Sequence, residues 1–337
     1  MSARAPRAAT MADVAREAGV SRQLVSLVIR DTGYVAPEKR KLVLEAAERL
    51  GYRRNNLAAS LAGRRSYSIG LVVLDIHNQV YADIADGVSD VLRPAGYQLL
   101  LATGAHRDDS GKSGLESLVG LRVDGVLVGT HLPEATELSR MLAGTPAVVV
   151  GESAKIAGVD AVRGDGELGI QMATEHLVAQ GHRRIAFIGG HAFQQNTDRR
   201  AGYRAVMERH GLEFCEEQSD ASEAAGEQAF GRLMRASGSR PTGVVCYNDT
   251  IAIGVLAGAR RAGLRVPEDL AVIGYDDTRA AAYPGVELTS VDQGTRNLGA
   301  QAARLLLERI EHPSREAACE VFAPKLVVRA SSQFQRN

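Results

Sequence analysis

Arg22 and Gln23 open a short helical segment, and their side chains suit hydrogen bonding to the edges of nucleic-acid bases. An Arg can donate to both acceptors of guanine, and a Gln can pair with adenine. In the alternative interpretation, the two side chains only solvate the exposed side of a surface helix. Other nearby side chains suit contacts to backbone phosphates, which would fix the register. These are Ser26, Thr10, Tyr34 and Lys39, and Ser21, Leu27 and Arg30 complete the candidate set.

Leu27 is the apolar member of this set and cannot donate a hydrogen bond. It could touch a thymine methyl group, or it could pack at the edge of a small helical core. Both interpretations stay open at this point.

A charge split along the chain supports a polyanionic partner for this segment. Residues 1–65 hold 13 Lys and Arg against 6 Asp and Glu, a net charge of +7, although the whole chain is formally neutral. The remaining residues carry −7. Basic segments of this kind bind nucleic acid by releasing counterions, whereas the plain alternative is an accidental cluster of solvated charges.

A second set of polar residues follows apolar runs that read as strands. In open α/β sheets, ligands bind beyond the carboxyl ends of the strands, so these positions are candidates for a small-molecule site. They are Asp75 and Asn78, residues 194–199, Asn248 with Asp249, and Asp276 with Asp277.

Three short helices must position the first set. Thr10 can cap a helix through Ala18, with Asp13 at its third position, and Gly19 permits a left-handed exit. Ser21 caps a second helix, Arg22 to Ile29, and the short link between them indicates a helix-turn-helix. A third helix is predicted from Pro37 to Leu50. Its apolar stripe, Leu42, Val43, Ala46, Ala47 and Leu50, should complete a miniature core.

From Tyr67 onward, short apolar runs alternate with helical periods, which predicts parallel sheets covered by helices on both faces. The predicted strands are 69–74, 98–102, 125–128, 147–150, 185–188, 243–247 and 271–274. The predicted helices are 80–92, 167–180, 200–210 and 251–262. About 270 residues of this pattern suit two doubly wound lobes better than one sheet.

The sequence argues against several other classes of protein. It has no Gly-rich phosphate loop after the first strand, no GxSxG elbow and no pair of His at metal spacing, so we expect no enzyme, cofactor or metal. Its three cysteines are far apart and predict no disulfide. No apolar run of about 18 residues or leader-like start is present, so we expect a cytoplasmic protein with no membrane partner.

These features together resemble the LacI/GalR family of bacterial transcription regulators. The resemblance rests on Met11 to Ser21, Glu48 to Arg53, Ala58 to Leu61, Gly181 to Ala186 and Val272 to Asp277, in the family's order. It implies a helix-turn-helix headpiece at 8–54, a hinge helix at 55–65 and a core at 66–337 similar to periplasmic sugar-binding proteins. The lobes are expected at about 66–163 plus 294–322 and 164–293 plus 323–337.

The resemblance also implies a homodimer that binds pseudo-palindromic operator DNA. Leu61 would wedge between base pairs of the minor groove, Asn55 would cap the hinge helix, and small Ala58 would allow close approach. The short C-terminal end lacks a leucine heptad, which favours a dimer over a tetramer. At Leu24, Leu27, Arg30 and Ala36 the sequence departs from the family pattern, so the operator sequence does not carry over from relatives.

For the core, the resemblance places an effector between the lobes. Arg199 and Asp276 match the arginine and the opposing carboxylate that commonly hold it, and Asn248 joins them. Weaker candidates are Asp75, Asn78, Tyr81 and Gln293. Such side chains suit a polyhydroxylated ligand, a sugar or sugar derivative, with a purine or another metabolite as the alternative. The plain alternative for Arg199 and Asp276 is a salt bridge that holds the lobes together.

The same resemblance implies an allosteric repressor whose lobes rotate when the ligand binds, which changes the spacing of the two hinges. A transport sugar-binding protein would share the two lobes, but it would need an export signal and no basic headpiece.

Overall fold

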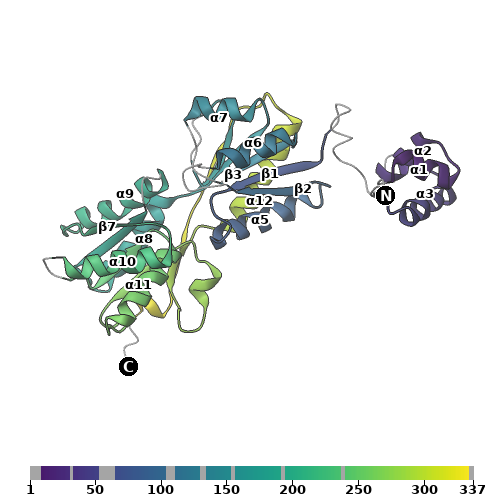
Figure 1. Cartoon of the computed structure of the whole chain (residues 1–337). Helices are drawn as coiled ribbons and strands as arrows, with labels where there is room; N and C mark the ends of the chain where they lie inside the picture. Colours follow the sequence, from purple (N-terminus) through teal and green to yellow (C-terminus); the bar gives the residue numbers. More distant parts are fainter. Residues whose placement is uncertain are drawn as a thin grey trace, which may run out of the picture. The chain divides into compact units, whose positions relative to one another are not determined.

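The computed structural model describes residues 9–30, 33–52, 65–103, 111–129, 134–152, 156–190, 194–236 and 240–333. The chain forms two compact units, Met1–Ser66 and Tyr67–Asn337 (Figure 1).

The described part of the first unit contains three helices, α1 (Met11–Ala18), α2 (Arg22–Arg30) and α3 (Pro37–Arg49). The predicted start of α1 is confirmed, because the Thr10 hydroxyl accepts from the Asp13 amide while the Asp13 carboxylate accepts from the Thr10 amide. Gly19 has a φ of 63°, which lets the chain leave the helix. Ser21 accepts from the Leu24 amide at 3.2 Å and so caps α2.

The core of this unit is smaller than the sequence predicts. Val14, Val25, Val28, Val43 and Ala46 are almost completely buried. The predicted stripe on the third helix is wrong at its two ends: Leu42 is 48% exposed and Leu50 is 37% exposed. Three short helices enclose only one row of α3 side chains, so residues at the flanks of that row face solvent.

The second unit contains two six-stranded sheets, one in each lobe. The sheet of the first lobe has the order β11-β5-β4-β3-β1-β2, and all its strands are parallel. Its strands are β1 (Ser68–Val73), β2 (Gln98–Thr103), β3 (Gly125–Gly129), β4 (Ala147–Val150), β5 (Asp160–Gly164) and β11 (Cys319–Phe322). Every residue of β1, β3 and β4 is buried, as expected for strands covered on both faces.

The sheet of the second lobe has the order β12-β10-β9-β8-β6-β7, with only β12 antiparallel to its neighbour among the described pairs. Its strands are β6 (Ile185–Gly190), β7 (Glu216–Ser219), β8 (Gly243–Cys246), β9 (Ala271–Tyr275), β10 (Thr289–Asp292) and β12 (Lys325–Val327). The chain passes between the lobes after β5, β10 and β11. The predicted architecture, a helix-turn-helix followed by a two-lobed α/β core, is confirmed.

Helices cover both faces of each sheet (Figure 1). The first lobe carries α5 (Gln79–Leu92), α6 (Lys112–Gly120), α7 (Ala135–Leu142) and α12 (Thr295–Glu311). The second carries α8 (Gly166–Ala179), α9 (Gln194–Arg209), α10 (Glu223–Arg235), α11 (Asp249–Arg261) and two short 3-10 turns, η1 (Arg279–Ala282) and η2 (Ala330–Ser332).

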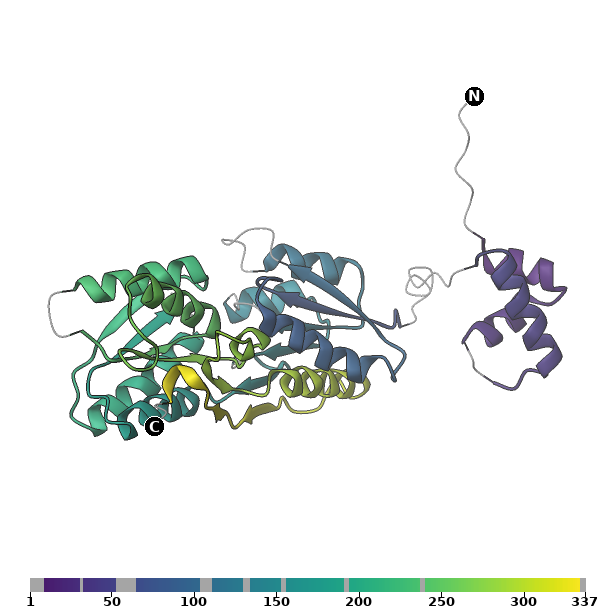
Figure 2. The same cartoon turned by 90° about the horizontal axis from the view of Figure 1, so that it is seen from below.

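Two glycines let α5 and α12 pack side by side, as Figure 2 shows. A Cβ at Gly87 would overlap the Arg296 carbonyl oxygen, and a Cβ at Gly299 would overlap that of Ile84. The helix backbones therefore touch, although the two segments lie more than 200 residues apart in the sequence.

We expect Gly299→Ala to lower the free energy of unfolding by about 1–3 kcal/mol, because the added methyl must push two helix backbones apart. Gly120→Ala is the matched control, since Gly120 is exposed at the end of α6 and a Cβ there would meet nothing within 4 Å. That change should be neutral or stabilise by up to about 1 kcal/mol. Urea titrations of both variants measure the difference, and equal effects would contradict the close packing.

Candidate ligand cleft and nucleic-acid interface

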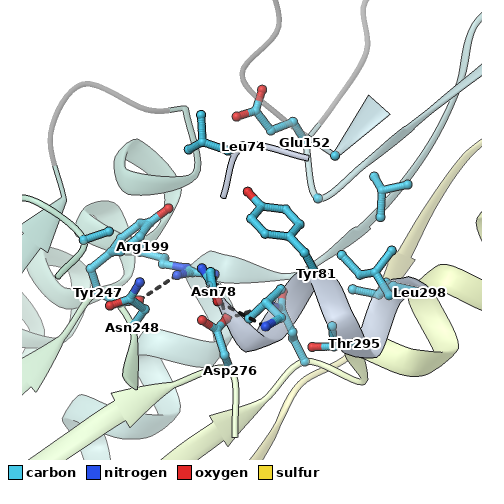
Figure 3. A pocket seen from close by; sticks show the side chains of 17 residues that line it. Leu74, Asn78, Tyr81, Glu152, Arg199, Tyr247, Asn248, Asp276, Thr295 and Leu298 are labelled. Atoms are coloured by element: carbon cyan, nitrogen blue, oxygen red, sulfur yellow. Dashed lines mark hydrogen bonds and ion pairs between the residues drawn. The ribbon is translucent and has the colours of Figure 1, made fainter. Parts of the chain in front are cut away.

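A cleft lies where the carboxyl ends of the strands of both lobes meet. The space between its walls is about 760 Å³ when open solvent is included. The first lobe lines it with residues at the ends of β1, β3 and β4 and with the first turns of α5. The second lobe contributes residues from α9 and residues that follow β8 and β9, and the segment that links β10 to α12 closes one side. Figure 3 shows the lining side chains.

Arg199 is the most constrained side chain of the cleft. Its guanidinium lies over the rings of Tyr247, at 4.4 Å, and Tyr275, at 3.7 Å. Its Nη1 donates to the Tyr247 carbonyl oxygen at 2.6 Å, and its Nη2 lies 3.6 Å from Oδ1 of Asp276. Only 5% of the side chain is exposed. Two cation–π contacts and a hydrogen bond thus fix the orientation of the guanidinium.

Asp276 faces Arg199 from the turn after β9. Its φ of 106° is a strained backbone conformation for a residue with a side chain, and such strain is often kept at binding sites. Its Oδ1 accepts from the Gln293 amide at 2.7 Å. Burial raises the pKa of Asp276 to about 7, although the nearby Arg199 and the Gln293 hydrogen bond favour the charged form.

Asp249 holds the turn that carries Asp276. Its carboxylate accepts from the amide and hydroxyl of Thr278, at 2.7 and 2.9 Å, and from the Ser290 hydroxyl at 2.5 Å. Burial raises the pKa of Asp249 to about 6, while these hydrogen bonds lower it. Asp249 therefore fixes the turn from which the Asp276 carboxylate faces the cleft.

Two asparagines at the cleft are helix caps. Asn78 accepts from the Val80 amide at 3.1 Å, and Asn248 accepts from the Ile251 amide at 3.0 Å. Each cap leaves the amide nitrogen of its side chain available as a donor. Tyr81 points into the cleft from the first turn of α5 (Figure 3). Burial raises the pKa of the Tyr81 hydroxyl, so it stays protonated and can donate.

Six of the seven residues predicted for the ligand site line this one cleft, namely Asn78, Tyr81, Arg199, Asn248, Asp276 and Gln293. The seventh, Asp75, is exposed outside the lining, where its carboxylate accepts from the His77 amide. Arg199 and Asp276 both belong to the second lobe, so their pair does not join the lobes as the alternative interpretation required.

Sequence reasoning missed three polar lining residues, Glu152, Tyr247 and Thr295. Glu152 follows β4 as Asp276 follows β9, so the same position rule would have found it. The sequence predicts Tyr247 as the last residue of a strand, but in the structure this strand, β8, ends at Cys246. Thr295 begins α12, a helix that was not predicted.

The candidate nucleic-acid interface lies on α2 and its surroundings. Ser21, Arg22, Gln23, Tyr34 and Lys39 are exposed, and Tyr34 is 93% exposed. Ser26 is half-buried, and the Thr10 hydroxyl donates to Asp13 at 2.6 Å as part of the helix cap. Leu27 is 37% exposed, so it lies at the edge of the small core and still presents apolar surface.

Asn55, Ala58 and Leu61, the predicted hinge contacts, lie outside the described residues, as does the side chain of Arg30.

Comparison with known proteins assigns both units. Residues 10–55 match the family described as bacterial regulatory proteins, lacI family, and residues 174–332 match a periplasmic binding protein-like domain. The HTH-type transcriptional repressor PurR of Pasteurella multocida (strain Pm70) is 33% identical over 329 residues, which cover 96% of this chain and 98% of that protein. The chain belongs to the lacI family.

Solved structures of lacI-family regulators agree with this assignment. A complex of the transcriptional regulator CelR with cellobiose is 34% identical, covers 96% of this chain and 100% of that one, and has a TM-score of 0.72. The lac repressor dimer bound to operator and an anti-inducer is 26% identical, with a TM-score of 0.85 and coverage of 97% and 100%. The prediction of a DNA-binding transcription regulator is confirmed.

Among its described residues, this lacI-family protein has no helix long and apolar enough to cross a membrane. The same part of the chain holds no group of three or more His, Cys, Asp or Glu side chains that could bind a metal ion.

The raised pKa of Asp276 predicts a pH-dependent stability. Between the usual value of 3.8 and about 7, the folded protein holds a proton that the unfolded chain has released, so this group's stabilisation is lost as the pH rises. We therefore expect Asp276→Asn, which cannot ionise, to gain stability relative to the parent protein from pH 5 to pH 7, at up to about 1.4 kcal/mol per pH unit. Thermal melts of both proteins across this range measure the difference, which should not stay constant.

Proposed function

We propose that this lacI-family protein is a homodimeric repressor whose affinity for operator DNA is set by a sugar or sugar derivative bound in the cleft. The observation that carries the proposal is the fixed Arg199–Asp276 pair at one end of a cleft shared by both lobes. A planar donor beside an acceptor carboxylate matches neighbouring hydroxyls, each of which both donates and accepts. The similarity to a regulator solved with cellobiose supports the sugar class.

In this proposal, α2 enters the major groove of a pseudo-palindromic operator. Arg22 and Gln23 read base edges, while Ser26, Tyr34 and Lys39 contact phosphates. Thr10 and Ser21 contribute mainly by capping their helices. The hinge contacts of Asn55, Ala58 and Leu61 would add a minor-groove readout, as the family resemblance implies. The similar lac repressor structure is a dimer on its operator, which supports the same assembly here.

Between the described residues, contacts of the two lobes outside the cleft include exposed ion pairs, and a ligand can bias the arrangement of the lobes against such contacts. Arg279, 63% exposed, lies 3.4 Å from Asp83 and 3.7 Å from Asp86 on α5, and the Ala280 amide donates to Gln79 at 3.3 Å. Exposed ion pairs of this kind contribute little. A ligand that contacts both lobes can favour one arrangement of the lobes over another. It changes the affinity for DNA only to the extent that it binds one arrangement more tightly than the other.

The central test combines operator selection with ligand screening. The full-length protein should enrich one pseudo-palindromic sequence from random duplex DNA, and a neutral sugar should both raise its melting temperature and change its affinity for that duplex. A fall in affinity identifies an inducer and a rise identifies a corepressor. A response to purines alone would replace the sugar by the alternative ligand class, and DNA binding that ignores every compound would contradict the proposal.

We expect Arg22→Ala to lose base preference at one position of each half-site, because the base contact carries about 1–3 kcal/mol of discrimination. Lys39→Ala should instead weaken binding about equally on all sequences and reduce the salt dependence. Fluorescence anisotropy on operators with single base changes separates the two effects. An unchanged preference in Arg22→Ala would show that Arg22 does not read bases.

Arg199→Lys keeps the positive charge but loses the planar group that lies over two tyrosine rings. We expect it to weaken the sugar response at least about tenfold while operator binding without sugar is kept. Arg209→Lys on the same helix is the control, since Arg209 pairs with Glu175 on the surface. Equal sugar responses in the two variants would remove Arg199 from the ligand site.

A further inference from the structure

Thr295, the first residue of α12, brings a buried hydroxyl to the cleft. The residue is only 7% exposed and lines the cleft, yet its hydroxyl makes no hydrogen bond with any described residue. A threonine at the cap position of a helix uses this oxygen to accept from a first-turn amide. Here Gly294 holds the cap position, and no side chain of the described residues caps α12. The local helix structure therefore does not account for the buried hydroxyl.

The wall around Thr295 is mainly apolar. The other side chains that α5 and α12 turn to the cleft pack with the hydrophobic core of the first lobe, and they are Val80, Tyr81, Ile84 and Leu298. Figure 3 shows Thr295 on this side of the cleft and Arg199 on the other. A buried hydroxyl costs free energy unless it is bonded, so a partner supplied from the cleft would stabilise it.

The opposite wall offers hydrogen-bond donors on Arg199. Its Nη1 donates to the Tyr247 carbonyl oxygen at 2.6 Å, but its Nη2 makes only an ion pair of 3.6 Å with Asp276. Its buried Nε has no hydrogen-bond partner among the described residues. A guanidinium has five N–H groups, so Arg199 can still donate to a ligand oxygen. In the described part of the core, each lobe thus presents a group with hydrogen bonds still to make, Thr295 on the first and Arg199 on the second.

We propose that Thr295 is a specificity-determining residue of the cleft, whose hydroxyl bonds one hydroxyl of the sugar while Arg199 bonds another part of the same molecule. This inference rests on the proposed function and adds a contact from the first lobe. A sugar hydroxyl can accept from Thr295 or donate to it, so the contact satisfies both groups. A sugar that lacks the hydroxyl at this position leaves Thr295 unpaired and binds more weakly, which makes the contact selective.

Thr295→Val tests the state of the hydroxyl without any ligand. The change replaces only the hydroxyl by a methyl group, so we expect the melting temperature of the full-length protein to rise by about 1–3 °C. Thr174→Val is the matched control, since the buried Thr174 hydroxyl donates to the Ile170 carbonyl oxygen at 2.8 Å, and this change should not raise the melting temperature. A lower melting temperature in Thr295→Val would mean that the hydroxyl is bonded inside the protein, which would overturn the inference.

Sugar binding tests the contact itself. Glucose, ribose and cellobiose are titrated by calorimetry into the full-length protein, and the tightest of them is compared with its monodeoxy analogues. We expect this sugar to bind Thr295→Val at least about fivefold more weakly than the parent protein, because a ligand hydroxyl is then buried without its partner. Thr295→Ser, which keeps the hydroxyl, and Thr174→Val, which does not line the cleft, should bind it about as tightly as the parent protein does. One deoxy analogue should lose a similar factor on the parent protein and nothing further on Thr295→Val.

The inference and the proposed function fail in different ways. Equal sugar affinities of the parent protein and Thr295→Val would overturn the role of Thr295 and leave the proposed function intact. The same holds if every deoxy analogue loses the same factor on both proteins, because no sugar hydroxyl would then depend on Thr295. If none of the three sugars binds the parent protein, the sugar class of the proposed function fails, and the contact assigned to Thr295 fails with it.

Discussion

The orientation of one buried guanidinium governs the chemistry of the cleft. Arg199 is held by two aromatic faces, a carbonyl oxygen and a carboxylate, and each of these comes from the ends of β8 and β9 or the turn beyond. A buried charge is tolerated only when it is paired and hydrogen-bonded, so the sheet ends and α9 must keep their relative positions. The strained turn at Asp276 and the support from Asp249 follow from this requirement, because the carboxylate must reach the guanidinium.

The first lobe lines the cleft in a different way. Besides the ends of its strands, it presents the starts of α5 and α12, two helices whose backbones touch at Gly87 and Gly299. α12 is also tied to β5 at its other end, where Arg309 donates to buried Asp160 at 2.9 Å. These connections tie both helix starts to the rest of the first lobe.

The sequence predicts the parts of this fold whose signals are local. The seven predicted strands are present with ends within two residues of the prediction, and most of them are continuously apolar because they are buried on both faces, whereas β2 is a partly exposed edge strand. Two of the strands that the sequence did not predict begin with acidic residues whose ion-pair partners lie on other elements. β7 begins with Glu216, which pairs with Arg200 and Arg204 of α9, and β5 begins with Asp160, whose arginine partners lie about 150 residues away. β10, β11 and β12 were not predicted either. β11 and β12 join their sheets only after the chain has crossed back into each lobe, and β10 precedes such a crossing. Asn248 and Asp276 were predicted because they follow apolar strands, whereas Tyr81 and Arg199 lie on helices and were singled out through the family resemblance. Glu152 was overlooked although it follows an apolar strand, and Thr295 was missed because its helix was missed.

The first lobe is also the end of the core that continues into the headpiece linker. The chain enters the core at Tyr67, whose amide donates to Asp124 at 2.9 Å and whose carbonyl accepts from the Gln98 amide at 2.9 Å. β1 then begins at Ser68 in the interior of the sheet, between β2 and β3. A segment anchored in this way belongs to the sheet of the first lobe. Because β1 begins next to Tyr67 and ends beside the cleft, one continuous strand connects the cleft to the point where the chain enters the core, and the proposed rotation of the lobe would carry Tyr67 with it.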